Sequence, residues 1–193
     1  MACDRVLHYR GMDFPWEEFV MAEIKAGVEP WMRGTHQEVP AAARAVIHAL
    51  ELAREDVARW CSHLTDDEWN LHPHGLPAAA FHLRHMARSM DRLLTYAEGE
   101  QLSPSQLEAM KGEADPHARG NELMAEFEAA LQRSEQRIQE LAKGDIEAAR
   151  ALGRKALPTS VGGLLVHVAD HTSRHLGQLV TTAKLAVASR GVF

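Results

Sequence analysis

Residues 162–187 read GGLLVHVADHTSRHLGQLVTTAKLAV, a stretch that carries the clearest helical pattern of the chain. Its apolar residues recur every three or four positions without an interrupting proline, which is typical of an amphipathic helix with one face in a core. The predicted core stripe includes His171 and His175, at positions where leucine would be the usual residue. We therefore expect a long helix from about residue 159 to 188 whose buried face carries imidazoles.

Three earlier segments carry the same helical periodicity, and no alternating strand pattern competes with them. The predicted helices cover residues 41–64, 77–98 and 121–143. The sequence thus predicts an all-α fold, a four-helix bundle in which the helix from about residue 159 is the fourth.

Two connecting segments shape the expected bundle. Gly99 fits a left-handed cap at the end of the second helix. The segment that follows it, up to about residue 120, is longer than antiparallel neighbours need, so a crossover between helices 2 and 3 is expected. In the turn after the first helix, Thr65 and Glu68 have the spacing of a capping box.

The predicted domain organisation is an N-terminal extension over residues 1–38 and a bundle over residues 39–193. The extension mixes aromatic residues with charges and glycines, and a short helix is expected near residues 16–26. We expect the extension to pack on the bundle or at a dimer interface.

Composition excludes several classes of protein. With 46% hydrophobic and 25% charged residues the chain matches an ordinary globular protein rather than a disordered one. The net charge of -6, without a concentrated basic face, argues against nucleic acid as a partner. No apolar run approaches the roughly 18 residues of a membrane span. Two cysteines are too few for a disulfide framework, so a reducing, cytoplasmic location is expected.

Histidine is the unusual component, with twelve residues. His167, His171 and His175 are spaced by four, which places neighbouring imidazoles on one helical face. All three cannot share one ion, because about 12 Å of helix rise separates the outer two. The core stripe favours the pair His171 and His175, and His85 on the second helix supplies a third candidate ligand.

One alternative ligand and two alternative interpretations stay open. His82 lies three residues before His85 and could replace it, although its neighbours place it nearer the edge of the core stripe. Buried imidazoles need partners, since an unsatisfied buried polar group costs about 1–3 kcal/mol. A metal would satisfy them together, but hydrogen bonds within the core would serve as well. Three imidazoles suit zinc, nickel or iron(II) and leave a position open for water or substrate.

The surroundings of the histidine pair refine the expected chemistry. HTSRH lacks the internal glutamate of the zinc-protease pattern, so peptidase activity is disfavoured. Gln178 could act as a partner that orients a ligand or holds a bound water, and Gly177 could allow close helix approach. Arg88 or Arg174 could receive an anionic substrate.

Taken together, FHLRHMARSMDRLLTYAEG (residues 81–99) and LLVHVADHTSRHLGQL (residues 164–179) resemble the DinB-like superfamily of metal-binding helical bundles. The resemblance covers roughly residues 40–188. It implies that His85, His171 and His175 bind a divalent metal. Where the family often has arginine after the second histidine of the pair, this chain has Leu176, which alters the surroundings of the ligands.

The resemblance also implies a function. Characterised members of the family include transferases and isomerases that use low-molecular-weight thiols such as mycothiol or bacillithiol. We therefore expect a metal-dependent enzyme of that type, or a hydrolase, in which a metal-bound water or thiol attacks a small electrophile. The alternative is a noncatalytic metal-binding bundle with a structural or stress-response role. Relatives commonly pair, so a homodimer is expected.

Overall fold

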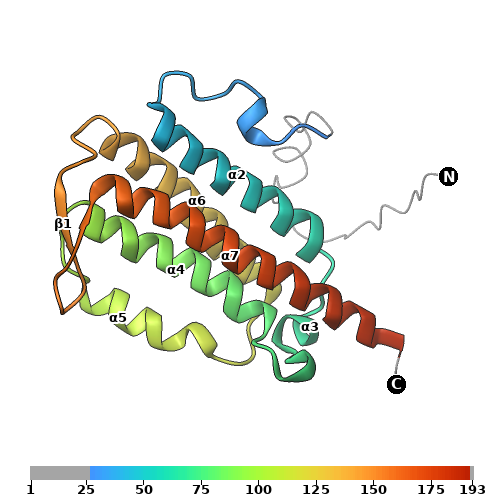
Figure 1. Ribbon diagram of the computed structural model, residues 1–193. Coiled ribbons are helices and arrows are strands. Elements are labelled where there is room, and N and C mark those ends of the chain that lie inside the picture. The colour runs from blue at the N-terminus through green and yellow to red at the C-terminus, as the bar shows by residue number, and fades with distance from the viewer. Residues whose placement is uncertain (1–26, 192–193) are drawn as a thin grey trace.

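The computed structural model describes residues 27–191, and four long helices dominate this range (Figure 1). They are α2 (Ala41–Cys61), α4 (Ala79–Ala97), α6 (Gly120–Leu141) and α7 (Val161–Ala188). α7 packs against both α2 and α4, and α6 packs against the same two helices. The prediction of a helical fold is confirmed. The helix expected near residues 16–26 lies outside the described residues.

Short elements connect the long helices. They are η1 (Pro30–Met32), α3 (Asp66–Asn70), η2 (Pro73–Gly75), α5 (Pro104–Lys111), η3 (Gly112–Ala114), β1 (Ala149–Leu152), β2 (Leu157–Ser160) and η4 (Ser189–Gly191). Of the predicted N-terminal extension, only residues 27–38 are described. There η1 contacts α2, and Arg33 Nη2 lies 2.8 Å from Glu55 Oε2.

The core lies where the four long helices meet. Leu83, Leu94, Ile138, Val168 and Leu179 are fully buried, and each belongs to the apolar stripe of its helix. Burying such a side chain contributes about 1.5–3 kcal/mol relative to leaving it exposed. Packing of these stripes therefore holds α4 and α7 side by side, and that pairing positions the histidines.

Two local predictions at helix ends are confirmed. The Thr65 hydroxyl accepts a hydrogen bond from the Glu68 backbone N–H, and the Glu68 carboxylate accepts one from the Thr65 backbone N–H. Gly99 adopts a φ of 89°, the left-handed conformation that glycine takes without steric cost.

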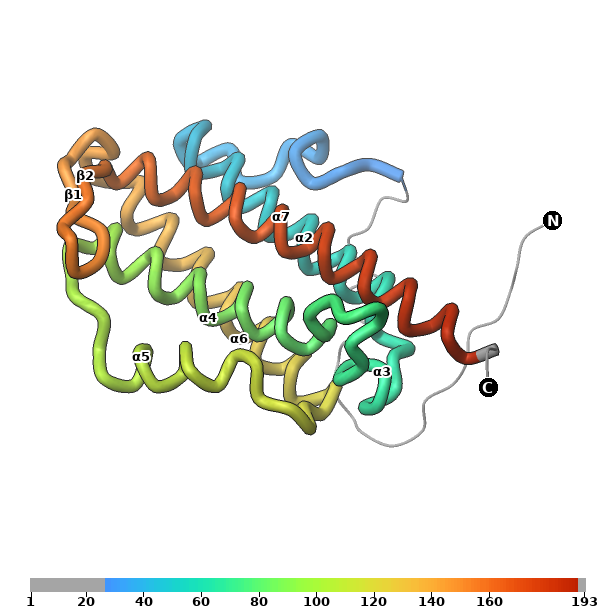
Figure 2. Tube along the Cα trace, turned by 60° about the horizontal axis from the view of Figure 1, so that its bottom comes forward, coloured from blue at the N-terminus to red at the C-terminus, as the bar shows by residue number. Residues whose placement is uncertain are grey.

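The crossover between α4 and α6 contains α5 and η3, and it runs along the outside of α4 (Figure 2). No residue of α5 is buried. Polar side chains of α4 hold the crossover instead: Arg84 donates to the Asp115 carbonyl at 2.6 Å, and Arg88 donates to the Ala109 carbonyl at 2.7 Å. The crossover is thus attached to the bundle by hydrogen bonds more than by apolar packing.

A two-stranded hairpin precedes α7 and was not predicted. β1 and β2 pair antiparallel, with Ala149 opposite Ser160 and Leu152 opposite Leu157. Each strand has only four residues and neither buries a side chain fully, so the alternation of apolar and polar residues that marks a half-buried strand is missing. No described helix combines the length and the apolar character that crossing a bilayer requires.

Candidate metal site

The pairing of α4 with α7 brings three histidines together. His85 on α4 and His171 and His175 on α7 each offer a ring nitrogen, and these three atoms all lie within 4.8 Å of one another. The ring centroids are 5.0 Å apart for His85 and His171, 4.4 Å for His85 and His175, and 4.6 Å for the α7 pair. We call these residues the histidine triad. It could bind one metal ion.

The spacing of the triad fits a small divalent cation. Zinc–nitrogen bonds of about 2.0–2.1 Å in a tetrahedral site put two ligand nitrogens about 3.3 Å apart. His85 Nε2 and His171 Nε2 are 2.8 Å apart, so this pair already stands close to that spacing. The third nitrogen, of His175, lies within 4.8 Å of the other two.

The triad lies at the edge of the core rather than inside it. We predicted that His171 and His175 would occupy the buried stripe of α7, but both are half-buried. Thr172 and Leu176 take the buried positions, at 1% and 8% exposure. The buried face of α7 is thus turned by about one residue from the predicted stripe. As a result the three imidazoles line the border between the core and solvent.

His82 is more buried than predicted and stays outside the triad. We expected it at the edge of the stripe of α4, yet it is 4% exposed while His85 is half-buried. Its Nδ1 lies 3.2 Å from His175 Nδ1. Burial, with His175 and His85 nearby, lowers the pKa of His82 to about 4. A neutral His82 can therefore support His175 through one hydrogen bond.

Burial favours the neutral form of the two triad histidines on α7. Burial lowers the pKa of His171 to about 4, and the neighbouring His175 and His85 add to this effect. Burial also lowers the pKa of His175, followed in effect by His85 and Arg174. Metal ligation needs the unprotonated imidazole. The lowered pKa values therefore favour rings in which one nitrogen is unprotonated and could bind a metal.

Aromatic packing restrains the third imidazole. The Phe81 ring stacks on His85 with centroids 5.5 Å apart and an interplanar angle of 18°. The same phenyl ring meets His175 edge-on at 6.5 Å. Phe81 thus forms an apolar wall beside the triad and limits the rotation of His85.

Glu113 is a site residue that sequence reasoning missed. Its Oε2 lies 2.6 Å from His85 Nδ1, and its Oε1 accepts a hydrogen bond of 2.6 Å from Arg92 Nη1. Burial alone would raise the pKa of this carboxyl, but the hydrogen bonds from His85 and Arg92 hold the pKa below its usual range. Glu113 belongs to η3 in the crossover, and no local sequence pattern indicates which crossover residue turns inward.

Other residues singled out in the sequence lie apart from the triad. Gln178 is exposed, and within residues 27–191 no hydrogen bond joins it to a triad imidazole. The expectation that Gly177 allows close helix approach is wrong, because a Cβ built there would meet no atom within 4 Å. Arg174 pairs with Asp170, and Asp170 Oδ2 also lies 3.8 Å from His167 Nδ1.

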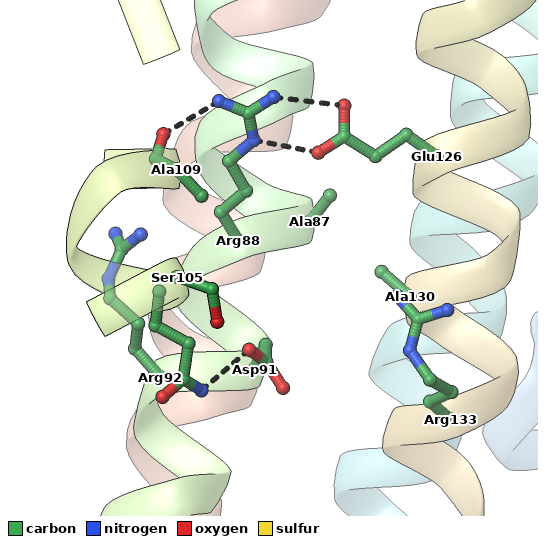
Figure 3. Close-up of a pocket in the computed structure, with 10 residues that line it drawn as sticks. Ala87, Arg88, Asp91, Arg92, Ser105, Ala109, Glu126, Ala130 and Arg133 are labelled. Carbon is green, nitrogen blue, oxygen red and sulfur yellow. Dashed lines mark hydrogen bonds and ion pairs between the residues drawn. The ribbon is translucent and has the colours of Figure 1, made fainter. Parts of the chain in front are cut away.

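Arg88 is likewise occupied by partners. It forms an ion pair with Glu126 at 2.7 Å and donates to the Ala109 carbonyl, as Figure 3 shows. Arg88 helps to line a cavity of about 250 Å³ between α4, α5 and α6. None of the triad histidines lines this cavity. The candidate metal site at the α4–α7 contact is therefore separate from this cavity.

Comparison with known proteins agrees with the geometry. A model of the DinB superfamily matches residues 49–179, which is more than half of the chain and includes all three triad histidines. No curated protein and no solved structure matches the chain. The extent of the family match, together with the helical fold, shows that this chain belongs to the DinB superfamily.

Proposed function

We propose that this protein is a divalent-metal-dependent enzyme of the thiol-dependent transferase, isomerase or hydrolase type. The observation that supports this most directly is the convergence of His85, His171 and His175 from two helices within 4.8 Å of one another. Zinc and nickel are the first candidates and iron(II) is the third, since imidazole suits all three.

A bound divalent ion held by three neutral ligands lowers the pKa of a water or a thiol and so supplies a nucleophile at neutral pH. The chain itself supplies the three donors and orients them. Phe81 restrains His85 by stacking, and His82 contacts His175 through their Nδ1 atoms. These contacts hold the donors in place while the half-buried position keeps one side of the triad accessible to a small substrate.

Catalysis is favoured over a structural metal because the triad offers three donors and is only half-buried. Structural zinc sites use four protein ligands, whereas catalytic sites use three and leave a position for water or substrate. The group that meets the ligand geometry among the described residues has three members. A small electrophile is the expected substrate class, and a low-molecular-weight thiol is the expected partner.

The first experiment is metal analysis of the protein purified without a histidine tag. We expect about one equivalent of divalent metal, and its loss in His85→Ala, His171→Ala and His175→Ala. His167→Ala is the matched control, because His167 has the same spacing on α7 but is exposed and outside the triad. Wild-type metal content in the three triad variants would overturn the proposal.

A second experiment addresses the reaction. Metal-loaded protein is assayed for transfer of mycothiol, bacillithiol and glutathione to small electrophiles, and for hydrolysis of activated esters. Activity that disappears in His171→Ala and survives in His167→Ala would support catalysis at the triad. Metal binding without any of these activities would favour the noncatalytic alternative.

The proposal includes a homodimer in the cytoplasm as the working form of the protein. Light scattering coupled to size-exclusion chromatography measures the mass in solution, and a monomer would refute the dimer without affecting the triad.

A further inference from the structure

A buried carboxylate of the crossover contacts the triad from outside. Glu113 is 5% exposed, and its two oxygens have different partners, His85 Nδ1 and Arg92 Nη1, each at 2.6 Å. A buried charge is costly unless it is paired and hydrogen-bonded. Both contacts go to α4, where Arg92 lies seven positions after His85. The carboxylate is thus held in one orientation, with one oxygen fixed on the imidazole.

The direction of this hydrogen bond determines the state of the imidazole. An ionised carboxylate only accepts hydrogen bonds, so the proton in the contact belongs to His85 Nδ1. A neutral imidazole that carries its proton on Nδ1 has a lone pair on Nε2. His85 Nε2 is the atom that lies 2.8 Å from His171 Nε2, inside the triad. The contact with Glu113 therefore turns the lone pair of His85 toward the position of the metal.

We propose that Glu113 is a positioning residue for His85, which it holds in the Nδ1-protonated form with Nε2 directed to the metal. This inference rests on the proposed function, because it assigns a role toward the same metal. Partners of this kind beside a metal ligand change metal affinity by about 10–100-fold when they are replaced. Arg92 acts indirectly, because its hydrogen bond holds the Glu113 carboxylate in place.

If Glu113 only anchored the crossover, its replacement would change neither the metal affinity nor the tautomer of His85. Glu113 also anchors the crossover, but that segment has independent attachments to α4 through Arg84 and Arg88. Removal of one anchor of several should leave the segment in place. Metal affinity and the tautomer of His85 are therefore the quantities that separate positioning from anchoring.

Glu113→Gln is the sharpest variant, because a glutamine amide cannot satisfy both partners. If its carbonyl oxygen faces Arg92, its NH₂ group faces His85 and forces the proton onto Nε2, where it blocks the metal. If the carbonyl faces His85 instead, the NH₂ group meets Arg92, which only donates. Glu126→Gln is the matched control, since Glu126 pairs with Arg88, which lies on α4 like His85, and within residues 27–191 no hydrogen bond or ion pair joins Glu126 to a histidine.

Zinc affinity is measured by competition with a chromophoric chelator for wild type, both glutamine variants and His171→Ala. We expect Glu113→Gln to bind zinc about 10–100-fold more weakly, and Glu126→Gln to bind as wild type. Equal affinity of Glu113→Gln and wild type, with binding lost in His171→Ala, would overturn this inference alone. Undiminished zinc binding in His171→Ala would instead overturn the proposed function, and the inference with it.

Nitrogen-15 NMR of the imidazoles in the metal-free protein gives a second readout. The wild type should show His85 protonated on Nδ1 and bare on Nε2, and Glu113→Gln should lose that form. A wild-type His85 protonated on Nε2 would overturn the inference. Because the wild-type tautomer is read without any substitution, this test holds even if Glu113→Gln fails to fold.

Discussion

His85 Nε2 and His171 Nε2 lie 2.8 Å apart although 86 positions separate the two residues in the chain. Two ring nitrogens at this distance repel through their lone pairs unless a proton or a cation lies between them. A proton between them makes an ordinary hydrogen bond, and a cation that took its place would bind to the folded state alone and so stabilise that state.

Zinc should raise the melting temperature of the metal-free protein. At a free zinc concentration of 100 Kd the expected stabilisation is about 2.7 kcal/mol. For a chain of this size that corresponds to a shift of roughly 5–10 °C. Differential scanning fluorimetry with and without a chelator measures the shift. His171→Ala should show almost none and His167→Ala the full shift; a full shift in both would contradict the assignment.

The parts of the site that follow from local helical geometry could be predicted from the sequence. The spacing of His171 and His175 fixes their common face through the pitch of one helix. The place of His85 opposite them needed the pairing of α4 with α7, which the family resemblance implied and which the apolar stripes alone do not determine. The rotation of α7 by about one residue was not predictable, because Thr172 and Leu176 compete with the histidines for the core.

Three features of the structure depend on tertiary packing and could not be predicted from the sequence pattern alone: the choice between His82 and His85, the contact of Glu113, and the hairpin. His82 and His85 are three residues apart on α4, and the packing of α4 against α7 determines which of them enters the triad. Glu113 could not be found, because it comes from an irregular crossover whose path depends on contacts such as the one between Arg84 and Asp115. The hairpin of β1 and β2 escaped prediction since its four-residue strands carry no periodic signal.

Two glycine-to-alanine substitutions should have opposite effects on stability. A Cβ at Gly120 would lie 2.5 Å from Nε1 of Trp69, whose side chain is 1% exposed and cannot move away. Overpacking of this kind costs about 1–3 kcal/mol. A Cβ at Gly177 would meet no atom within 4 Å, in the middle of α7. Alanine there should stabilise the protein by about 0.5–1 kcal/mol.

Urea unfolding of the wild type, Gly120→Ala and Gly177→Ala measures how much each substitution changes the free energy of unfolding. A chelator is present so that metal binding does not contribute. A destabilised Gly177→Ala, or a Gly120→Ala as stable as wild type, would contradict the packing described around these two positions.

The ion pair between Glu68 and Arg190 should make stability depend on acid pH. Arg190 Nη2 donates to Glu68 Oε2 at 2.7 Å, which ties η4 to α3. The hydrogen bond from Arg190 is the main cause that lowers the Glu68 pKa from 4.5 to about 2, with Thr65 assisting and burial opposing. A carboxyl with a lowered pKa in the folded state contributes stability that is complete above pH 4.5 and is lost as pH falls through about 2.

Glu68→Gln should therefore be less stable than wild type at pH 7, and the difference should shrink between pH 4.5 and 2. Chemical unfolding at pH 7, 4 and 2.5 measures it. The control is Glu108→Gln, which removes a carboxylate paired with Lys111 at the exposed surface. A difference between Glu68→Gln and wild type that stays constant down to pH 2 would show that the charge of Glu68 has no part in the effect.

Cys61 should be unreactive in the folded protein, which limits where the thiol of the proposed reaction can come from. Its side chain is 1% exposed at the end of α2, and burial raises the pKa of its thiol to about 12. The thiolate is the nucleophile in thiol chemistry, so a buried neutral thiol neither attacks an electrophile nor binds a metal. Cys3 lies outside the described residues, and a Cys3→Ser variant isolates Cys61.

With Ellman's reagent at pH 8, Cys3→Ser should release no chromophore while folded, and one equivalent after unfolding in guanidinium. Fast labelling of the folded variant would contradict the burial of Cys61 and would make it a candidate nucleophile. Slow labelling at the rate of unfolding would agree with burial. In that case Cys61 does not supply the thiol for chemistry at the triad, which agrees with the proposed use of a low-molecular-weight thiol as a substrate.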